Sequence, residues 1–356
     1  MKTAAVCICN YNKQDMIAQC LQAVAEQRCT DYDVYVCDNH STDDSEKVIE
    51  DFIKKNKGLH TRLIRTDENL GGAGGFDTAL RAALDADEKY KYLMCVDNDC
   101  LLDEGCVDKL AAFLDTHPDS GMAAAKIYFL DNPDLIQCYG LDISYDLCGT
   151  VSPYLGKLED GSAPEVVYSD ASPACALMIR TELAERIGLL PEENYIYWDD
   201  TTWCYRVRRA GYRIANVGKA MALHGLGQRA EVRNTFGTYY AWRNQIRYFM
   251  QTTPEEKLPD VAIRILTDIY LEAAGDYECG KSERCAAVMA ALDDAVHGVT
   301  GRARDGIIRD IASTESDVVY ESVDSLPEKY RAGAEIFIYS HYELFMEGCG
   351  KARTLV

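Results

Sequence analysis

The chain is short of positive charge: 37 Lys and Arg residues stand against 58 Asp and Glu residues, for a formal net charge of −21. This deficit argues against a general nucleic-acid-binding protein and against a polybasic patch for a membrane surface, so we expect no nucleic-acid partner. No apolar run approaches the length that spans a bilayer. The sequence also lacks internal repeats and low-complexity segments, and its 356 residues suffice for one large domain or two ordinary ones.

The 15 cysteines lack any repeated CxxC spacing, which argues against a structural zinc site. No signal peptide precedes the first apolar run, so we expect free thiols in a reducing cytosol. The sequence therefore predicts a cytoplasmic protein. Peripheral contact with the inner face of a membrane stays open.

A phosphate-binding loop of the Walker type is also missing, since no Gly-Lys-Ser/Thr follows the glycine-rich run at 69–75. The run does not follow the first strand either, where a dinucleotide fingerprint belongs. It suits a tight turn that packs a strand against a helix, and equally a loop that lies against a nucleotide or sugar. The spacing favours neither interpretation.

Strand patterns alternate with helix patterns in the first part of the chain, which predicts an α/β class fold with a doubly wound, mostly parallel sheet. The predicted strands are 4–9, 33–37, 59–65 and 90–96, and the predicted helices are 15–27, one ending near 57, 76–86 and 103–115. Such sheets bind ligands beyond the carboxyl ends of their strands. The polar segments at Asn10, Asp38, Asn69 and Asp97 should therefore converge on one cleft.

The second part of the chain changes from mixed to helical patterns. Further strands are predicted at 123–130, 136–143, 174–180, 213–217 and 220–223, and further helices at 181–187, up to 210 and at 238–248, with 144–170 irregular. Beyond residue 254 the predicted helices are 261–274, 282–296, 301–313 and 325–345. We expect a catalytic region at 1–230 and a C-terminal helical region at 231–356, and a homo-oligomer formed through these helices stays open.

Asp97 and Asp99 follow a buried strand one residue apart, so their side chains point to the same side and repel each other. They suit a Mg²⁺ or Mn²⁺ ion that holds a phosphate-bearing substrate, or else a solvated turn. The motif alone favours the turn, but convergence of the polar segments on one cleft favours the metal. His224 follows an apolar run and is either an ordinary histidine or a third ligand.

Asp199 and Asp200 form a second acidic pair at a predicted helix start. Such a pair often does no more than complement the helix dipole. Here Trp198 and Trp203 flank it, and an aromatic setting suits stacking on sugar rings and raises a carboxylate pKa towards general-base use. Arg243 and Arg247 lie on one helix face, four residues apart, and are candidates for contact with phosphate.

These motifs together resemble family 2 inverting glycosyltransferases of the GT-A fold. The matching segments, in order, are Asn10-Tyr11-Asn12, Asp38-Asn39-His40-Ser41-Thr42-Asp43, Asn69-Leu70-Gly71-Gly72-Ala73-Gly74-Gly75, Asp97-Asn98-Asp99, Trp198-Asp199-Asp200 and His224. The resemblance covers about residues 3–250 and is greatest to the galactofuranosyltransferase and rhamnosyltransferase branch. The turn after the first strand is Cys9-Asn10-Tyr11-Asn12 where the family usually has Thr-Tyr-Asn, a mild departure, and the resemblance does not extend to the last hundred residues.

The resemblance implies a Rossmann-like GT-A fold and a role for each matching residue. Asp38 would recognise the nucleotide base, Asp200 would be the catalytic base, and the metal would be Mg²⁺ or Mn²⁺ on the donor diphosphate. The remaining donor contacts would be Asn10, Asn12, Asn69, Gly71, Asp97 and Asn98, the metal ligands Asp97, Asp99 and His224, and the acceptor contacts Trp198, Asp199 and Trp203.

The sequence thus predicts a metal-dependent inverting glycosyltransferase. Its donor would be a UDP or dTDP sugar, with UDP-galactofuranose and dTDP-rhamnose as candidates, and its acceptor a glycan or lipid-linked saccharide of the cell surface. A sugar nucleotidyltransferase shares the fold class, but it would have a glycine-rich loop after the first strand. A non-catalytic nucleotide-sugar-binding protein is the other alternative, and the intact acids at Asp97, Asp99 and Asp200 argue against it.

Overall fold

The computed structural model describes residues 1–29, 31–225, 234–311 and 318–353. The chain divides into two compact units. The first unit comprises Met1–Asp142, Val151–Tyr195 and Asp199–Arg229, and the second comprises Ile143–Thr150, Ile196–Trp198 and Ala230–Val356. Within the described residues, no helix combines the length and the apolar composition needed to cross a bilayer.

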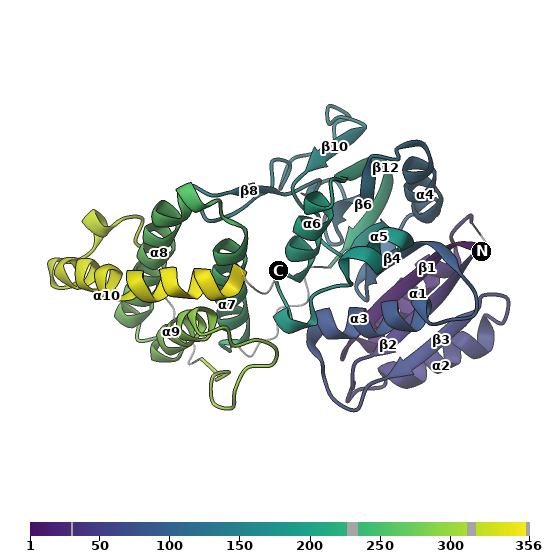
Figure 1. Ribbon diagram of the computed structural model, residues 1–356. Coiled ribbons are helices and arrows are strands. Elements are labelled where there is room, and N and C mark those ends of the chain that lie inside the picture. The colour runs from purple at the N-terminus through teal and green to yellow at the C-terminus, as the bar shows by residue number, and fades with distance from the viewer. Residues whose placement is uncertain (30, 226–233, 312–317, 354–356) are drawn as a thin grey trace. The chain divides into compact units, whose positions relative to one another are not determined.

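The first unit is a sheet with helices on both faces (Figure 1). Its strands are β1 (Lys2–Asn10), β2 (Tyr32–Asp38), β3 (Thr61–Arg65), β4 (Tyr90–Asp97), β5 (Cys100–Leu102), β6 (Ser120–Phe129), β7 (Ile136–Cys138), β10 (Val166–Ser169), β11 (Ala176–Arg180) and β12 (Arg213–His224). Its helices are α1 (Gln14–Ala25), α2 (Ser45–Lys55), α3 (Gly71–Leu84), α4 (Cys106–Thr116), α5 (Thr181–Ile187) and α6 (Asp199–Arg209).

The strand order is β10-β12-β6-β11-β4-β1-β2-β3, with β5 paired to β12 and β7 paired to β6. The strands from β3 to β4 run parallel, and β12 runs parallel to β6. β11 is antiparallel to both of its neighbours, β4 and β6. The predicted α/β class with a mostly parallel sheet is confirmed. The antiparallel β11, placed in the middle of the sheet, was not foreseen.

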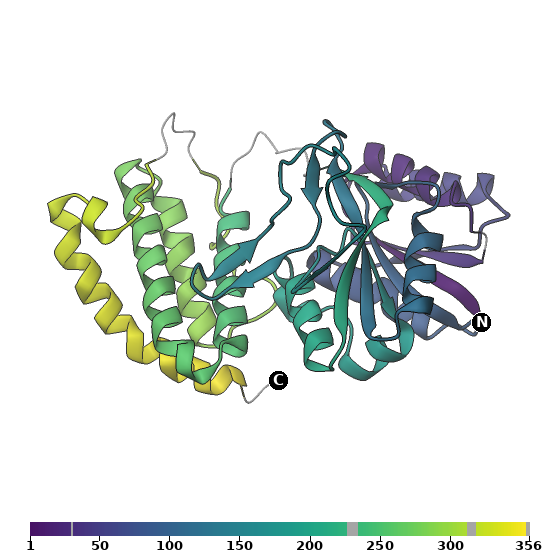
Figure 2. The same cartoon turned by 90° about the horizontal axis from the view of Figure 1, so that it is seen from above.

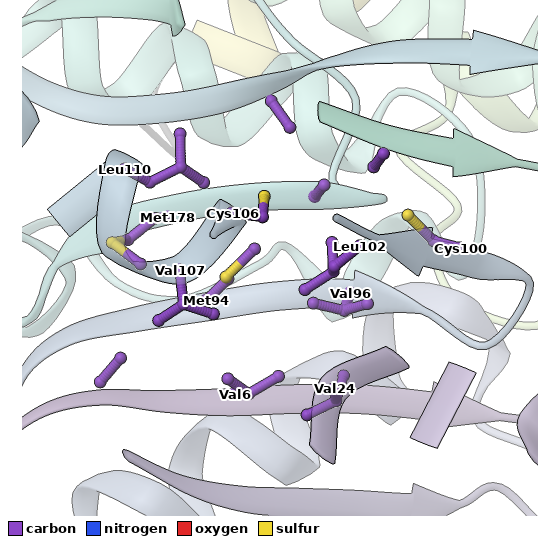
Figure 3. Packing of buried hydrophobic residues seen from close by; sticks show 14 of the residues in the cluster. Val6, Val24, Met94, Val96, Cys100, Leu102, Cys106, Val107, Leu110 and Met178 are labelled. Carbon is purple, nitrogen blue, oxygen red and sulfur yellow. The ribbon is translucent and has the colours of Figure 1, made fainter. Parts of the chain in front are cut away.

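Alternation of side chains along each strand fills two apolar layers, one on each face of the sheet. On one face the sheet packs against α1, α2 and α4, and on the other against α3, α5 and α6. Figure 3 shows the first layer, in which Val6 of β1, Met94 of β4 and Met178 of β11 gather with Val107 and Leu110 of α4. Burial of each such side chain contributes about 1.5–3 kcal/mol, so this layer fixes the sheet from which the polar segments emerge.

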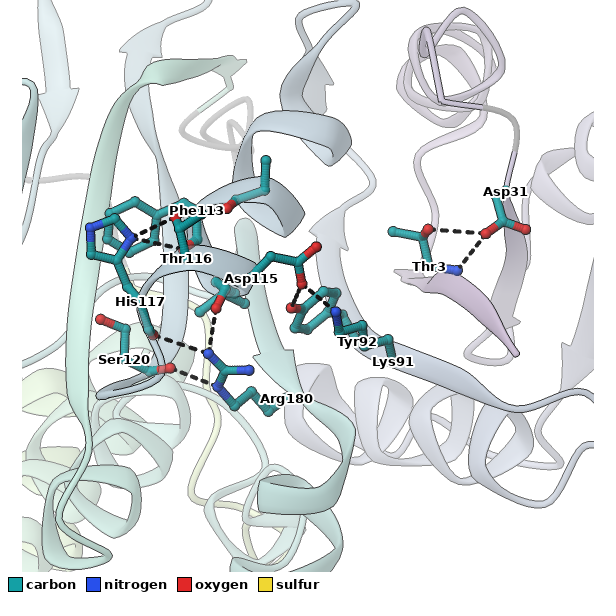
Figure 4. A network of polar contacts seen from close by, with 12 residues as sticks. Thr3, Asp31, Lys91, Tyr92, Phe113, Asp115, Thr116, His117, Ser120 and Arg180 are labelled. Carbon is teal, nitrogen blue, oxygen red and sulfur yellow. Dashed lines mark hydrogen bonds and ion pairs between the residues drawn. The ribbon is translucent and has the colours of Figure 1, made fainter.

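Arg180 joins the end of α4 to the start of β6 (Figure 4). Its guanidinium donates hydrogen bonds to the backbone carbonyls of Leu114, His117 and Ser120, at 2.5, 3.0 and 2.9 Å. The last carbonyls of a helix have no partner within the helix, and a guanidinium supplies several donors in one plane. Arg180 therefore ends the helix and holds the turn into the next strand.

The glycine-rich run lies inside α3, which begins at Gly71 and not near residue 76 as predicted. Gly71 has φ +74, and a Cβ there would lie 2.2 Å from the carbonyl oxygen of Tyr195. A Cβ on Gly75 would lie 2.2 Å from Sγ of Cys9. The same Tyr195 carbonyl accepts a hydrogen bond from the amide of Ala73 at 3.1 Å. Close packing against strand β1 and Tyr195 thus explains these glycines.

Other element boundaries also differ from the predictions. The predicted strands at 213–217 and 220–223 are one strand, β12, which has a register shift between Val217 and Met221. The predicted strand at 136–143 is divided between β7 and β8 (Asp142–Ser144). The segment predicted as irregular contains β9 (Gly149–Val151), which pairs with β8, and β10.

The second unit is helical, and its helices pack on one another in both views (Figures 1 and 2). They are α7 (Phe236–Thr252), α8 (Leu258–Glu278), α9 (Ser282–Val296) and α10 (Glu328–Arg353). The predicted helix at 301–313 is wrong where it is described: residues 301–311 form turns and loop, and 312–313 lie outside the described residues. Gly301 and Gly306 have φ +72 and +83, which a right-handed helix does not allow.

A buried polar cluster holds this loop to the helices of the second unit. The guanidinium of Arg243, which is 0% exposed, donates to the carbonyl of Gly301 at 2.8 Å. Asp294 accepts a hydrogen bond from the Tyr239 hydroxyl at 2.6 Å and pairs with Arg304. The proposed contact of Arg243 with phosphate is therefore wrong, because this side chain is enclosed and serves the packing of the unit.

We expect Gly71→Ala to destabilise the first unit by about 1–3 kcal/mol, because the added methyl would meet a backbone oxygen that cannot rotate away. Gly58→Ala is the matched control, since a Cβ at Gly58 meets nothing within 4 Å. Urea unfolding of both variants measures the difference. Equal stability of the two variants would show that the contact between Gly71 and Tyr195 does not constrain the turn.

Candidate functional site

The carboxyl ends of three adjacent strands bring the first candidate residues together. Register pairs Asn10 of β1 with Asp38 of β2, and Cys9 of β1 with Asp97 of β4. Parallel strands that are in register end at the same edge of the sheet. The expected convergence of Asn10, Asp38 and Asp97 is therefore present in the first unit.

Asn10 lies at the centre of this edge and is 0% exposed. Its amide nitrogen donates to Oδ1 of Asp38 at 3.1 Å, and its amide oxygen accepts a hydrogen bond from Asn98 at 2.8 Å. The other carboxylate oxygen of Asp38 accepts the backbone amide of Ser41 at 3.2 Å. Each oxygen of Asp38 has further lone-pair capacity, so this buried carboxylate can still accept a hydrogen bond from a ligand.

Asn12 ties two loops together. Its side-chain oxygen accepts a hydrogen bond from the backbone amide of Thr42 at 2.7 Å, and its backbone amide donates to Oγ of Ser41 at 3.1 Å. Asn12 has φ 50, a left-handed conformation that Asn tolerates better than most residues. The side chain thus holds the loop after β1 against the loop after β2, whatever contact it makes with a nucleotide.

Asn69 and Gly71 are held by Asn39, a residue whose role the sequence did not reveal. The Asn39 amide nitrogen donates to Oδ1 of Asn69 at 3.2 Å and to the carbonyl of Gly71 at 2.8 Å. Its amide oxygen accepts the backbone amide of Leu70 at 2.9 Å. The only hint in the sequence is the position of Asn39, directly after Asp38. Asn39 fixes the entry into α3 beside the nucleotide-binding candidates.

The metal candidates meet because β12 and β11 pair with the segments around Asp97 and Asp99. His224 of β12 is opposite Cys100 of β5, and its Nε2 lies 3.3 Å from Oδ2 of Asp97 and 3.2 Å from Oδ1 of Asp99. Antiparallel pairing of Ala176 with Val96 brings Cys175 next to Asp97, whose amide donates to the Cys175 carbonyl at 3.1 Å. The predicted trio is thus together, and Cys175 joins it.

The ring orientation of His224 is fixed by Gln137. The Gln137 amide nitrogen donates to the His224 carbonyl at 3.0 Å, which turns its amide oxygen to Nδ1 of His224, 2.6 Å away. Nδ1 therefore carries a proton and donates it, and Nε2 faces the acids. Metal-binding histidines are held in this way by an outer hydrogen-bond partner.

Charges around His224 offset one another. Burial alone would lower the pKa of the imidazole, but the Cys175 sulfur and hydrogen bonds to Asp97 and Asp99 raise it to about 11. Burial disfavours ionisation of Asp99, yet His224 and Lys13 together lower the pKa of its carboxyl below the usual value. The Lys13 ammonium lies 3.4 Å from Oδ2 of Asp99.

This donor set fits a divalent cation. Asp97, Cys175 and His224 each offer one donor atom, and these atoms all lie within 4.8 Å of one another. Asp99, through the oxygen beside Nε2 of His224, can supply a fourth. Carboxylate oxygen and imidazole nitrogen suit Mn²⁺, and oxygen alone suits Mg²⁺. Cys175 was missed because nothing local in the sequence marks the antiparallel pairing of β11 with β4.

The second acidic pair opens helix α6. Burial, followed by the negative charges of Asp200 and Asp97, raises the pKa of Asp199 from 3.8 to about 8. Burial also raises the pKa of Asp200, and the backbone amide and hydroxyl of Thr201 partly oppose that rise by donating to its carboxylate. Both carboxyls therefore hold a proton more readily than an isolated aspartate does, and the pKa of Asp199 rises to about 8.

The two tryptophans that flank this pair differ. Trp203 is 0% exposed, and its indole N–H donates to the carbonyl of Gly188 at 2.9 Å. Its predicted contact with an acceptor sugar is wrong, because its side chain is enclosed in the apolar layer on that face of the sheet and leaves no ring face for a sugar. Trp198 belongs to the second unit and is half-buried, with its ring 5.1 Å from that of Tyr248. Its acceptor role stays a prediction.

Three backbone positions before α6 are strained. Tyr195, Tyr197 and Trp198 have φ values of 67, 64 and 63, which bulky side chains rarely adopt. Asn244 of α7 donates to the carbonyls of Ile196 and Tyr197 at 2.7 and 3.1 Å, within the second unit. Strain of this kind costs about 1–3 kcal/mol per residue and concentrates near functional sites.

The sequence of the chain matches a known family and known relatives. The family model for glycosyl transferase family 2 matches residues 5–182, half of the chain. The teichoic acid poly(glycerol phosphate) polymerase of Staphylococcus epidermidis is 30% identical over 209 residues, 56% of this chain. The match covers 25% of that relative, so the chain spans only a minor part of its length.

Two solved structures share the fold. The crystal structure of S. aureus TarS 1–349 in complex with UDP-GlcNAc is 16% identical with a TM-score of 0.55, and the match covers 99% of this chain and 92% of that one. The crystal structure of GalNAc-T7 with UDP, GalNAc and Mn²⁺ is 15% identical with a TM-score of 0.61, and the match covers 75% of this chain and 51% of that one. The expected GT-A fold, Rossmann-like and of α/β class, is thereby confirmed.

We expect Asp199→Asn to become more stable relative to the parent protein as the pH rises from 3.8 to about 8. In this interval folded Asp199 keeps a proton that the unfolded chain releases, so rising pH favours unfolding of the parent and not of the variant. Midpoints of thermal unfolding in the presence of a chelator measure the effect. Asp67→Asn, at an exposed carboxyl, controls for the loss of one charge. A constant difference across the interval would refute the raised pKa.

Proposed function

This chain belongs to glycosyl transferase family 2, and on that premise we propose that it moves a sugar from a nucleoside-diphosphate donor onto a hydroxyl of a glycan or lipid-linked saccharide, with inversion. The observation that carries the proposal is the half-buried Asp199–Asp200 pair beside Asp97. Burial and the charge of Asp97 raise the pKa of both carboxyls of the pair. A proton acceptor thus stands beside a candidate phosphate-holding carboxylate.

The proposed donor is a UDP sugar. Asp38 supports this proposal, because it is 3% exposed and its oxygens can accept a further hydrogen bond from a base N–H. Support also comes from TarS 1–349, which shares the fold and was solved with UDP-GlcNAc. Asn10, Asn12, Asn69, Gly71 and Asn98 would line the nucleotide. A dTDP sugar is the alternative, and galactofuranose or rhamnose stays a prediction from the motif order.

Asp97, Asp99 and His224 would hold a Mg²⁺ or Mn²⁺ ion on the donor diphosphate. The fold relative GalNAc-T7, solved with UDP and Mn²⁺, supports a divalent cation in this role. Such a cation neutralises charge that develops on a departing diphosphate. Lys13 lies beside Asp99 and would add positive charge on the same side.

Asp200 is the proposed general base. Its carboxylate accepts the proton of the acceptor hydroxyl while the hydroxyl oxygen forms a bond to the anomeric carbon. The bond from that carbon to the phosphate oxygen breaks, and the nucleoside diphosphate leaves with the electron pair. One displacement inverts the carbon without an enzyme nucleophile. Asp199 keeps its proton at neutral pH and can donate a hydrogen bond to the acceptor.

We assign this chemistry to residues 1–230, and the helices of 231–356 have no proposed part in it. The name of the staphylococcal relative, a teichoic acid polymerase, supports an acceptor among cell-surface polymers. A sugar nucleotidyltransferase gains no support from the structure, since no glycine-rich loop follows β1, where Asn10 and Asn12 stand instead.

UDP together with Mn²⁺ should raise the midpoint of thermal unfolding, since a ligand that binds only the folded chain adds about 2.7 kcal/mol at one hundred times its dissociation constant. Asp97→Asn and Asp99→Asn should abolish the Mn²⁺-dependent part of this shift, because each removes a charge that would hold the cation. Asp67→Asn serves as the exposed control. An equal Mn²⁺-dependent shift in all four proteins would refute Asp97 and Asp99 as metal ligands, and no shift of the parent with UDP would refute the donor assignment.

Asp200→Asn should lower the rate of sugar transfer about 10²–10⁴-fold while UDP still binds, because the amide cannot accept the acceptor proton. Asp199→Asn is the matched control: it is isosteric and adjacent, and it reproduces the neutral form that Asp199 has at neutral pH. This variant should keep most of the activity. Release of UDP and formation of product are measured together, and a larger loss in Asp199→Asn than in Asp200→Asn would reverse the two roles.

A further inference from the structure

The Cys175 thiol lies among the candidate metal ligands and is 2% exposed. Its sulfur, a carboxylate oxygen of Asp97 and a ring nitrogen of His224 all lie within 4.8 Å of one another. Donor atoms around one ion are about 3–4 Å apart when metal–sulfur bonds are about 2.3 Å and metal–nitrogen bonds about 2.0–2.1 Å. Small side-chain rotations would therefore bring all three donors onto one cation.

The backbone holds Cys175 in this place. Its carbonyl accepts the Asp97 amide at 3.1 Å, and the next residue, Ala176, pairs with Val96 across the antiparallel strands. The sulfur also has an outer partner, since the side chain of buried Cys100 is hydrogen-bonded to it. An S–H group that donates to a metal-bound thiolate stabilises it, as outer-shell partners do for other ligands.

A thiol changes which cation such a site prefers. Mg²⁺ takes oxygen ligands and binds sulfur poorly, whereas thiolate and imidazole together suit Zn²⁺, Co²⁺ and Cd²⁺, with Mn²⁺ between the extremes. Among the residues that the structure describes, Asp97, Cys175 and His224 form the one group of three such side chains close enough to share an ion. No other cysteine among the described residues belongs to such a group of three.

We propose that Cys175 is a metal ligand of this site and selects thiophilic transition-metal ions over Mg²⁺. The biological role of the metal rests on the function proposed above. Binding of the metal through sulfur does not, because it can be observed without sugar transfer. Binding of the ion releases the thiol proton to solvent and forms a metal–sulfur bond, with no change of oxidation state.

The test titrates the whole protein with Co²⁺ or Cd²⁺ under reducing conditions, with and without UDP, and follows the sulfur-to-metal charge-transfer absorption. We expect the band to develop with the first equivalent, and Mg²⁺ to compete poorly for the site. Cys175→Ala should remove the band and weaken Co²⁺ binding at least about 10–100-fold, the loss known for weaker outer-shell changes. Cys7→Ala, at a fully buried thiol of β1, is the matched control and should retain both.

Cys175→Ser provides a second variant of nearly unchanged volume should the alanine variant fold poorly, and thermal unfolding checks both. A band that persists in both Cys175 variants, or tight Co²⁺ binding by the parent without any band, overturns the proposal. A protein that shows the band but transfers no sugar leaves Cys175 a ligand and refutes the proposed function instead. A protein that transfers sugar with Mn²⁺ yet never shows the band refutes the role of Cys175 alone.

Discussion

Repulsion between carboxyl groups is the constraint on which the candidate site depends. The charge of Asp97 contributes to the raised pKa of Asp199 and of Asp200, and Asp99 follows Asp97 just after the end of β4. The first unit offsets this charge in two ways. One is a proton held by Asp199, and the other is the positive charge of His224 and Lys13, both within 3.4 Å of Asp99. Each of these features would have a chemical use in the proposed sugar transfer.

Local patterns in the sequence sufficed for much of the fold. The strands that end at Asn10, Asp38 and Asp97 were predicted because apolar runs alternate with amphipathic helices, and their parallel register then follows from the connections. Such predictions succeed where a motif sits directly after an element whose direction is known. The metal-binding set of Asp97, Asp99 and His224 came from the resemblance to family 2 glycosyltransferases and not from local patterns, and the structure brings the three side chains together.

Predictions failed where long-range packing decides the outcome. Cys175 lies next to Asp97 only because β11 pairs with β4 in the antiparallel direction. The sequence near Cys175 contains no motif that predicts this pairing. Trp203 was predicted to contact an acceptor sugar, but its side chain is fully buried in the core. The predicted helix after residue 300 has adequate apolar spacing, yet Gly301 and Gly306 adopt φ values that a helix forbids, and Arg243 binds the resulting loop.

The chemistry of the site is best understood as competition between a proton and a cation for the same acids. His224 with a pKa near 11 is an imidazolium at neutral pH, and its Nε2 proton lies between Asp97 and Asp99. A cation bound there would need the neutral imidazole, so its binding would expel the Nε2 proton of His224. The cation must also carry enough positive charge to replace that proton. A divalent ion would bring two positive charges, which replace the protons that leave His224 and Cys175. If Asp97 bound the cation, it would repel the Asp200 carboxylate less, and the ionised form of Asp200 would be favoured. In the proposed mechanism, loading of the cation and activation of the base would thus be linked through Asp97.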